Sequence, residues 1–126
     1  MGANPVIRAS ELKLETERKD SETTVRTTGR ITSGTSASLE KTLRELMPEG
    51  KRIVLDLTNV DYIDSAGIGA LVSVFLHASR TNCLLKITNP KERIRDLFKR
   101  SGLAAVFEGD SFDELWKAWS RNSSEA

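Results

Sequence analysis

The sequence predicts a single α/β domain, in which a mixed β-sheet of about five strands, opening with an N-terminal hairpin, carries about four helices. The length of 126 residues suits one domain. Two strand-like segments follow each other near the N-terminus. After them, short apolar runs alternate with segments of helical periodicity, a pattern typical of strands joined by helices across one sheet.

The N-terminal hairpin is predicted by two neighbouring segments. Residues 12–16 alternate apolar and polar side chains, as a half-buried strand does. Residues 23–28 are rich in β-branched threonine and valine, which favour strands. The polar residues 19–22 between them are typical of a turn.

The middle of the chain predicts two helices around a buried strand. Leu39, Leu43 and Leu46 recur at helical spacing, and Pro48 is expected to end that first helix. Residues 53–57 (IVLDL) form a nearly continuous apolar run, typical of a strand covered on both faces. Residues 65–80 form the second helix. Its apolar face is expected to comprise Ile68, Leu71, Val72, Phe75 and Leu76.

The last part of the chain predicts two more strands and two more helices. Residues 83–87 read as a buried strand. Asn89 is expected to cap the third helix, with Pro90 in its first position and Gly102 near its end. Its buried side chains are expected to be Ile94, Leu97 and Phe98. A short strand at 105–107 and a final helix follow; that helix has a capping box of Ser111 and Glu114 and carries Leu115, Trp116 and Trp119.

The domain boundaries follow from the two ends of the chain. Residues 1–10 lack periodicity and are expected to be a flexible N-terminus, and residues 121–126 a flexible polar tail. Residues 11–120 then form the domain.

Composition narrows the class of protein. The 18 acidic and 19 basic residues nearly cancel, which argues against a dedicated nucleic-acid binder. The one cysteine, Cys83, excludes an internal disulfide. No targeting segment is visible, and the longest uncharged stretch, residues 65–79, is too short to span a bilayer. We therefore expect a cytoplasmic protein without membrane insertion.

Enzymatic motifs are missing from the sequence. The only histidine, His77, has no second histidine with which to bind a metal. Ser65 lacks the preceding glycine of a nucleophile elbow, and no phosphate-binding glycine loop is complete. Asp56, Asp61 and Asp64 are close in sequence but lack the spacing of a calcium loop. No catalytic residue, metal site or cofactor is predicted.

The junction of strand and helix around Ser65 is the most informative segment. Asp64 and Ser65 stand where backbone N–H groups lack intrahelical partners, and either side chain can cap them. A phosphate on Ser65 would meet those N–H groups, although Asp64 opposes the added charge. Gly67 and Gly69 weaken the helix, which suggests that another backbone comes close, either this chain's own sheet or a partner.

The pattern of residues 53–57, Val60 and 63–71 (IDSAGIGAL) resembles the signature of the STAS domain family, and more narrowly that of the bacterial anti-sigma factor antagonists. The resemblance covers nearly all of residues 11–119, including the segment from Leu97 to Leu103. It implies that Ser65 is phosphorylated by an anti-sigma factor with GHKL-type serine kinase activity. The unphosphorylated form binds that partner and frees a sigma factor, and a PP2C-type phosphatase resets the switch. The chain would be a substrate rather than an enzyme.

The resemblance has one departure and implies a partner-binding surface. Thr32 stands where the family often has an aspartate, which affects any nucleotide contact or partner choice that depends on that carboxylate. Spacing places Ser65, Gly69 and Ser73 on the outward side of their helix. The expected partner-binding residues are Thr32, Ser33, Thr35, Asp64, Ser65, Ala66, Gly67, Gly69 and Ser73.

Two alternatives stay open. The chain could be a non-switching STAS scaffold or adaptor subunit of a signalling or transport complex, in which Ser65 is structural. It could also be a small enzyme or ligand-binding domain that shares only the architecture. We expect a monomer or weak homodimer that makes no direct contact with nucleic acid.

Overall fold

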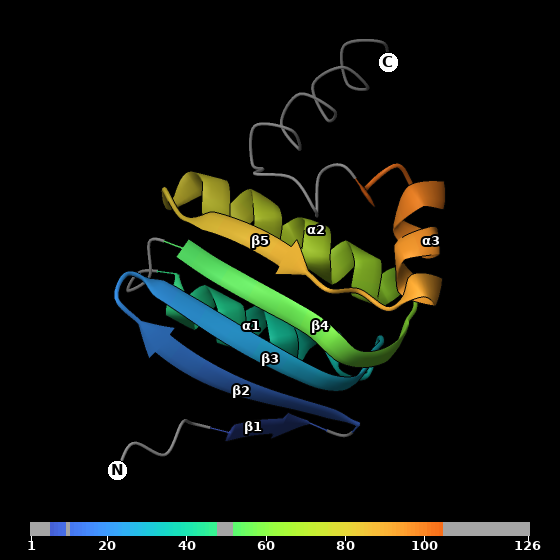
Figure 1. Cartoon of the computed structure of the whole chain (residues 1–126), viewed down its shortest axis with the longest axis horizontal. Coiled ribbons are helices and arrows are strands. Elements are labelled where there is room, and N and C mark those ends of the chain that lie inside the picture. The colour runs from blue at the N-terminus through green and yellow to red at the C-terminus, as the bar shows by residue number, and fades with distance from the viewer. Residues whose placement is uncertain (1–5, 10, 48–51, 105–126) are drawn as a thin grey trace, which may run out of the picture.

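The computed structural model describes residues 6–9, 11–47 and 52–104, which form one sheet with helices packed on it (Figure 1). The strands are β1 (Val6–Ala9), β2 (Leu12–Lys19), β3 (Glu22–Ile31), β4 (Arg52–Ile63) and β5 (Leu84–Thr88). The helices are α1 (Ser36–Leu46), α2 (Ser65–Arg80) and α3 (Glu92–Arg100).

The sheet is mixed, as the sequence predicts. Its spatial order is β1-β2-β3-β4-β5, with antiparallel pairing from β1 to β3 and parallel pairing from β3 to β5. The hairpin of β2 and β3 is confirmed, and residues 53–57 lie in β4, which is an interior strand. β4 is longer than expected, because two register irregularities against β3 let it continue to Ile63.

β1 was not predicted: Val6–Ala9 form a short strand that pairs with β2. The pairing comes from backbone hydrogen bonds, which leave no hydrophobic pattern in so short a strand. The strand predicted at 105–107 and the helix predicted at 111–119 lie outside the described residues.

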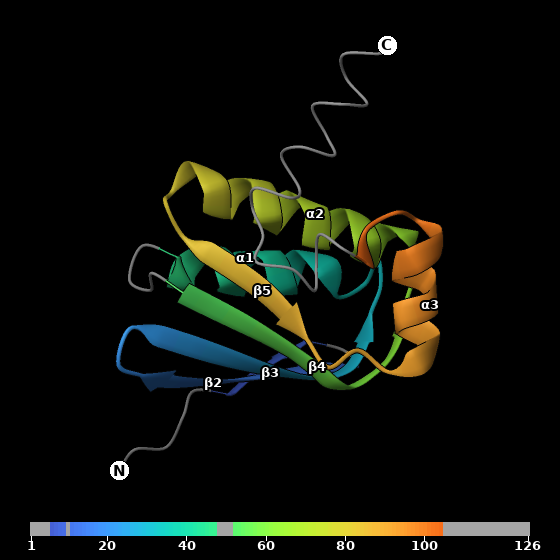
Figure 2. The same ribbon diagram turned by 45° about the horizontal axis from the view of Figure 1, so that its top comes forward.

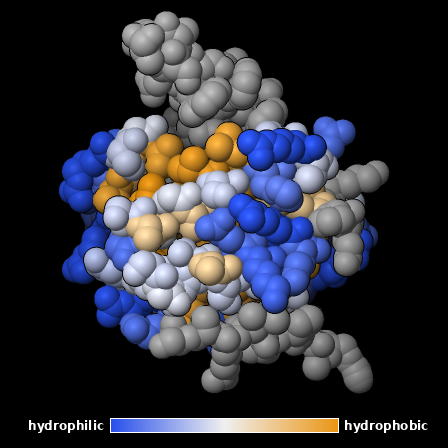
Figure 3. Space-filling model, turned by 180° about the vertical axis from the view of Figure 1, so that it is seen from behind, coloured by the Kyte–Doolittle hydropathy of each residue, from blue (hydrophilic) through white to orange (hydrophobic). Residues whose placement is uncertain are grey.

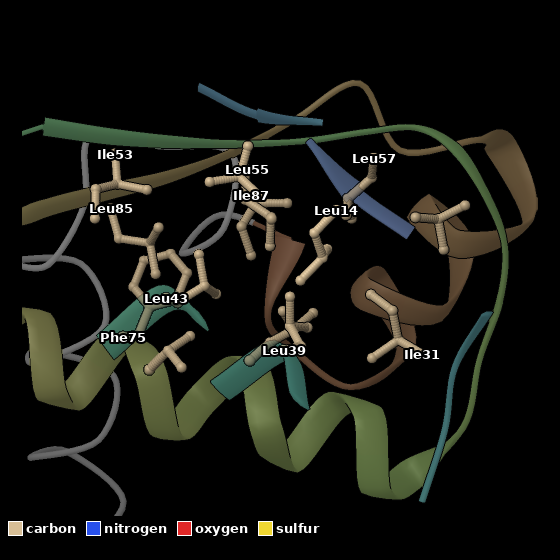
Figure 4. Close-up of a cluster of buried hydrophobic side chains, with 14 of the residues drawn as sticks. Leu14, Ile31, Leu39, Leu43, Ile53, Leu55, Leu57, Phe75, Leu85 and Ile87 are labelled. Atoms are coloured by element: carbon tan, nitrogen blue, oxygen red, sulfur yellow. The ribbon is translucent and has the colours of Figure 1, made fainter. Parts of the chain in front are cut away.

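One face of the sheet carries the core. α1 and α2 lie together on that face (Figure 2), and the strand side chains that point toward them are buried (Figure 4). Burial along β4 alternates: Ile53 and Leu55 are buried, whereas Val54 and Asp56 are half-buried. The prediction that residues 53–57 are covered on both faces is therefore wrong, because no helix in the described part of the chain packs on the second face.

α2 has its predicted bounds but presents a rotated face to the sheet. The residues it buries are Gly67, Ala70, Leu71, Val74, Phe75 and Ala78. Leu71 and Phe75 are buried as predicted, but Ile68, Val72 and Leu76 are only half-buried at the margin of the core. Small residues such as Gly67 and Ala70 let the helix approach the strands closely. The larger apolar side chains at the margin of the core stay partly exposed, and apolar surface is therefore visible in the space-filling view from behind (Figure 3).

α3 begins later than predicted. Asn89 has a left-handed backbone (φ 57°), which is incompatible with an N-cap, and its amide donates a 3.5 Å hydrogen bond to Asp56 instead. Lys91 occupies the N-cap position. The helix buries Ile94 and Phe98 and ends just before Gly102, as predicted.

The described ranges contain no helix that is long and apolar enough to cross a membrane. Even α2, the longest at 16 residues, falls short of the length and apolar character that crossing a bilayer requires.

Candidate functional site

The candidate site begins at the N-terminus of α2, where Asp64 is the cap. Its backbone is extended (φ −102°, ψ −175°), and its Oδ1 accepts a 2.9 Å hydrogen bond from the N–H of Gly67. The N–H of Asp64 donates to the carbonyl of Ile31 at 3.2 Å. Of the two residues that could cap the helix, Asp64 does so, and it also ties the start of α2 to the end of β3.

The loop of residues 32–35, between β3 and α1, is held beside this cap. The N–H of Ser33 donates to the second oxygen of Asp64, Oδ2, at 3.3 Å. The buried hydroxyl of Thr35 donates to the carbonyl of Arg30 at 2.8 Å and accepts from the N–H of Thr32 at 2.9 Å. The structure thus brings together the two segments that the sequence assigned to one surface, and Asp64 joins them.

Ser65 is the first residue of α2 and is exposed. Its hydroxyl makes no hydrogen bond to another described residue, so nothing in that part of the chain must break for the oxygen to react. The N-terminus of a helix favours negative charge, but the Asp64 carboxylate already uses the N–H of Gly67. A phosphate on Ser65 would therefore gain from the helix and be opposed by Asp64.

The two glycines of the first turns have different roles. A Cβ on Gly67 would lie 2.3 Å from the carbonyl oxygen of Ile31 and 2.8 Å from Ile63 Cγ2, so the backbone that comes close at Gly67 is this chain's own. A Cβ on Gly69 would meet no atom of another described residue within 4 Å. Of the two, only Gly69 leaves room for a partner.

The other predicted partner-binding residues divide into contact and support positions. Thr35 and Gly67 are buried and support the surface from beneath. Ser33 is exposed, and Thr32 and Ala66 are half-buried. Thr32 Oγ1 accepts from the N–H of Gly34 at 3.2 Å within the loop.

Ser73 lies apart from the rest of the predicted surface. It follows Ser65 by eight residues, roughly 12 Å along a helix axis. It is half-buried, and its Oγ accepts a 2.9 Å hydrogen bond from Arg44 Nη2 on α1. The structure thus places Ser73 at the α1–α2 boundary, whereas Ser65 and Gly69 are exposed.

Residues 61 and 62, just before the cap, form polar contacts that sequence reasoning missed. Tyr62 is 42% exposed, and the guanidinium of Arg30 lies 4.7 Å from its ring centroid. Asp61 accepts a 2.5 Å hydrogen bond from Lys91 Nζ, and this hydrogen bond and charge hold the pKa of the Asp61 carboxyl below its usual range. The local signal for this patch in the sequence was an aromatic residue, Tyr62, two positions before Asp64.

The three aspartates of this region have different partners. Asp64 caps α2, Asp61 pairs with Lys91, and Asp56 Oδ1 accepts a 2.6 Å bond from the hydroxyl of Thr58. No group of three acidic, histidine or cysteine side chains suited to a metal occurs in the described ranges.

Comparison with known proteins supplies the context for this geometry. The sequence model described as STAS domain matches residues 13–118. An anti-sigma-B factor antagonist of Staphylococcus aureus is 32% identical over 93 residues, covering 73% of this chain and 86% of the relative.

Solved structures agree on the fold. The unphosphorylated form of the anti-sigma factor antagonist SpoIIAA aligns with a TM-score of 0.66 and 16% identity, over 86% of this chain and 96% of that one. The phosphorylated form of SpoIIAA, a Bacillus cell fate determinant, aligns with a TM-score of 0.61 and 17% identity, over 86% and 97%.

Proposed function

This chain belongs to the STAS domain family, and from that premise we propose that it is an anti-sigma factor antagonist that works by partner switching. In this proposal the unphosphorylated chain binds an anti-sigma factor that is also a GHKL-type serine kinase, and a sigma factor is released. Phosphorylation of Ser65 abolishes the binding, and a PP2C-type phosphatase restores it. The chain is a substrate and a binding partner, and the kinase supplies the catalysis.

One observation carries the proposal: the Ser65 hydroxyl is exposed at the start of a helix, among small residues, with no hydrogen bond to another described residue. Gly69, one turn further, is equally open. A partner can therefore approach this part of the backbone closely. The similarity to an anti-sigma-B factor antagonist, and to an anti-sigma factor antagonist solved in unphosphorylated and phosphorylated forms, supports the same role.

The physical effect of phosphate differs between the free and the bound protein. A phosphoserine adds about −1.5 to −2 charges at neutral pH. In the free protein, water and the N-terminus of α2 accommodate that charge, so the fold survives. In a complex the same group must lose water and find space beside the Asp64 carboxylate. Each loss of about 1.4 kcal/mol in binding lowers affinity tenfold.

The test uses the cognate anti-sigma factor kinase. Incubation with that kinase and ATP, followed by mass spectrometry, should place the phosphate on the peptide that contains Ser65. In calorimetric titration, Ser65→Ala should bind the kinase without being switched off, and Ser65→Asp should bind at least tenfold more weakly. Ser21→Ala, at an exposed serine of the β2–β3 turn, is the matched control and should behave as wild type.

The outcome separates the switch from the scaffold alternative. Both Ser65 variants should melt near the wild type, because Asp64 rather than Ser65 caps the helix. Equal affinity of two folded Ser65 variants for the kinase would mean that Ser65 is structural, and the scaffold or adaptor function would replace the switch.

A further inference from the structure

A small groove lies between the end of β4 and α3, close to the surface at the start of α2 that carries Ser65 and Gly69. In Figures 1 and 2, α3 stands beside the end of α2 that begins at Ser65. The groove has a volume of about 200 Å³. Its lining residues are Asp61, Tyr62, Ile63, Arg93, Ile94, Leu97 and Arg100. We call it the α3 groove.

The floor of the α3 groove is apolar and its rim is basic. Ile63 and Ile94 are buried, and Leu97 is half-buried. Arg93 and Arg100 are exposed, lie seven residues apart on one face of α3, and form no ion pair with another described residue. These two charges are therefore available to a ligand.

The other charges near the groove are of both signs. Asp61, the one acidic residue in the lining, is paired with Lys91. Arg30, which pairs with Glu11, adds a further cation over the ring of Tyr62. The acidic residues of α3, Glu92 and Asp96, lie outside the groove lining but share a neighbouring hollow with Arg93 and Arg100. The described lining of the α3 groove itself thus combines an apolar floor with two arginines and one aspartate that is already paired.

We propose that the α3 groove docks a segment of the partner protein in which one large apolar side chain is flanked by carboxylates. The identity of that partner as an anti-sigma factor rests on the proposed function. The volume is below that of pockets for drug-sized ligands and suits one side chain. A single apolar anchor surrounded by rim contacts is the usual form of a binding hot spot, and carboxylates complement the two arginines.

Of two other occupants, a second copy of the chain fits less well. A second copy of the chain in a two-fold contact would bring two positive rims together. The chain's own residues 107–114 (FEGDSFDE) have the right composition, with two phenylalanines and four acidic residues. This intramolecular alternative is an outcome of the test below.

The first experiment uses peptides and the full-length protein, so that it does not depend on the anti-sigma factor. A peptide Gly-Glu-Glu-Phe-Glu-Glu-Gly is titrated into ¹⁵N-labelled protein. We expect saturable chemical-shift changes of the amides of residues 61–63 and 93–100, with a dissociation constant for the peptide of about 1 mM. Peptides with lysine in place of glutamate, or alanine in place of phenylalanine, should bind at least tenfold more weakly.

Charge reversal locates the contact. The variant Arg93→Glu with Arg100→Glu should lower peptide affinity at least tenfold. The control variant, Lys41→Glu with Arg52→Glu, carries the same charge change at exposed positions on α1 and β4, and should bind as wild type. The amide spectrum of each variant reports whether it is folded.

Three results would overturn the proposal: no saturable shift, equal binding of the lysine peptide, or equal loss in both charge-reversal variants. A fourth would assign the groove to the chain itself. If changing Glu108, Asp110, Asp113 and Glu114 to their amides raises peptide affinity tenfold, residues 107–114 occupy the α3 groove.

With the anti-sigma factor, the Arg93 and Arg100 variant should weaken binding in the Ser65→Ala background too. A failed Ser65 switch with intact peptide binding would overturn only the proposed function.

Discussion

The inward and outward sides of the first turns of α2 differ sharply, although only two residues separate Gly67 from Gly69. At Gly67 the helix touches β3 so closely that a Cβ would lie 2.3 Å from a carbonyl oxygen. At Gly69 the described part of the chain places no neighbouring atom within 4 Å of that position. The same residue type is thus required by packing on one side and leaves a surface free on the other. Both glycines suggested that another backbone comes close. The comparison shows that this backbone is the chain's own at Gly67, and that Gly69 has no such contact with the described residues.

The largest effect is expected from Gly67→Ala. The added methyl group would overlap the carbonyl of Ile31 and the side chain of Ile63, and backbone cannot move as cheaply as a flexible side chain. Overpacking of this kind costs typically 1–3 kcal/mol. Urea denaturation should show a loss at the upper end of that range.

The matched control is Gly69→Ala. It places a methyl group in open space and replaces glycine within a helix, which is worth roughly 1 kcal/mol in favour of alanine. Changes of opposite sign in the free energy of unfolding of the two variants would support the difference between Gly67 and Gly69. A similar loss in both would mean that helix geometry, rather than the contact with Ile31, decides the requirement for glycine.

A bulky residue at Gly69 tests the outward side. Gly69→Trp should leave the stability of the free protein within about 1 kcal/mol of wild type, because its side chain points into open space. The same variant should lower affinity for the anti-sigma factor at least tenfold, or about 1.4 kcal/mol, by occupying the contact surface. Calorimetric titration gives the affinity, and unchanged affinity of the folded variant would remove Gly69 from that surface.

Much of this arrangement is readable in the sequence, and the reason lies in local signals. The bounds of α2 were predicted because the Asp-Ser pair marks its start and apolar residues follow at helical spacing. Its buried face was predicted with an error, because Gly67 and Ala70 face the sheet without contributing a strong hydropathy signal. β1 was missed because four residues carry too little pattern.

Contacts between distant parts of the chain could not be predicted in the same way. The hydrogen bond from Ser33 to Asp64 joins residues 31 apart, and the α3 groove combines residues 61–63 with residues 93–100. The sequence placed the loop and the helix on one surface only through the family resemblance. Nothing local identifies Arg93 and Arg100 as rim residues, because an amphipathic helix normally exposes arginines to water.

Asp64→Ala tests the residue that joins the start of α2 to the loop of residues 32–35. Loss of an N-cap carboxylate costs typically about 1 kcal/mol. The variant also removes the acceptor for the N–H of Ser33, so hydrogen exchange of residues 32–35 should accelerate. Asp64→Asn retains an oxygen acceptor and should lose less stability. Equal losses in the two variants would show that the charge of Asp64, rather than its hydrogen bonds, stabilises the junction.

The smallest effect is expected at Asp56, which lies on β4 before the junction and on the face of the sheet that α1 and α2 leave open. Partial burial raises the pKa of this carboxyl, but hydrogen bonds from the hydroxyl and N–H of Thr58 and from Asn89, together with the charge of Arg26, outweigh burial and lower the pKa.

A lowered pKa in the folded state stabilises the protein above the unfolded pKa of about 3.9, and this contribution is lost as pH falls through the folded value. Because the group is largely solvated, Asp56→Asn should cost only a few tenths of a kcal/mol at pH 7. It should reduce the pH dependence of stability below about pH 4 and leave the range from pH 6 to 8 unchanged. Thr58→Val is the informative companion: NMR titration of the Asp56 carboxyl should show its pKa rising when that hydroxyl is removed. An unchanged pKa would mean that the Thr58 hydroxyl does not control this group, and that the remaining donors, the N–H of Thr58 and the amide of Asn89, together with the charge of Arg26, lower its pKa.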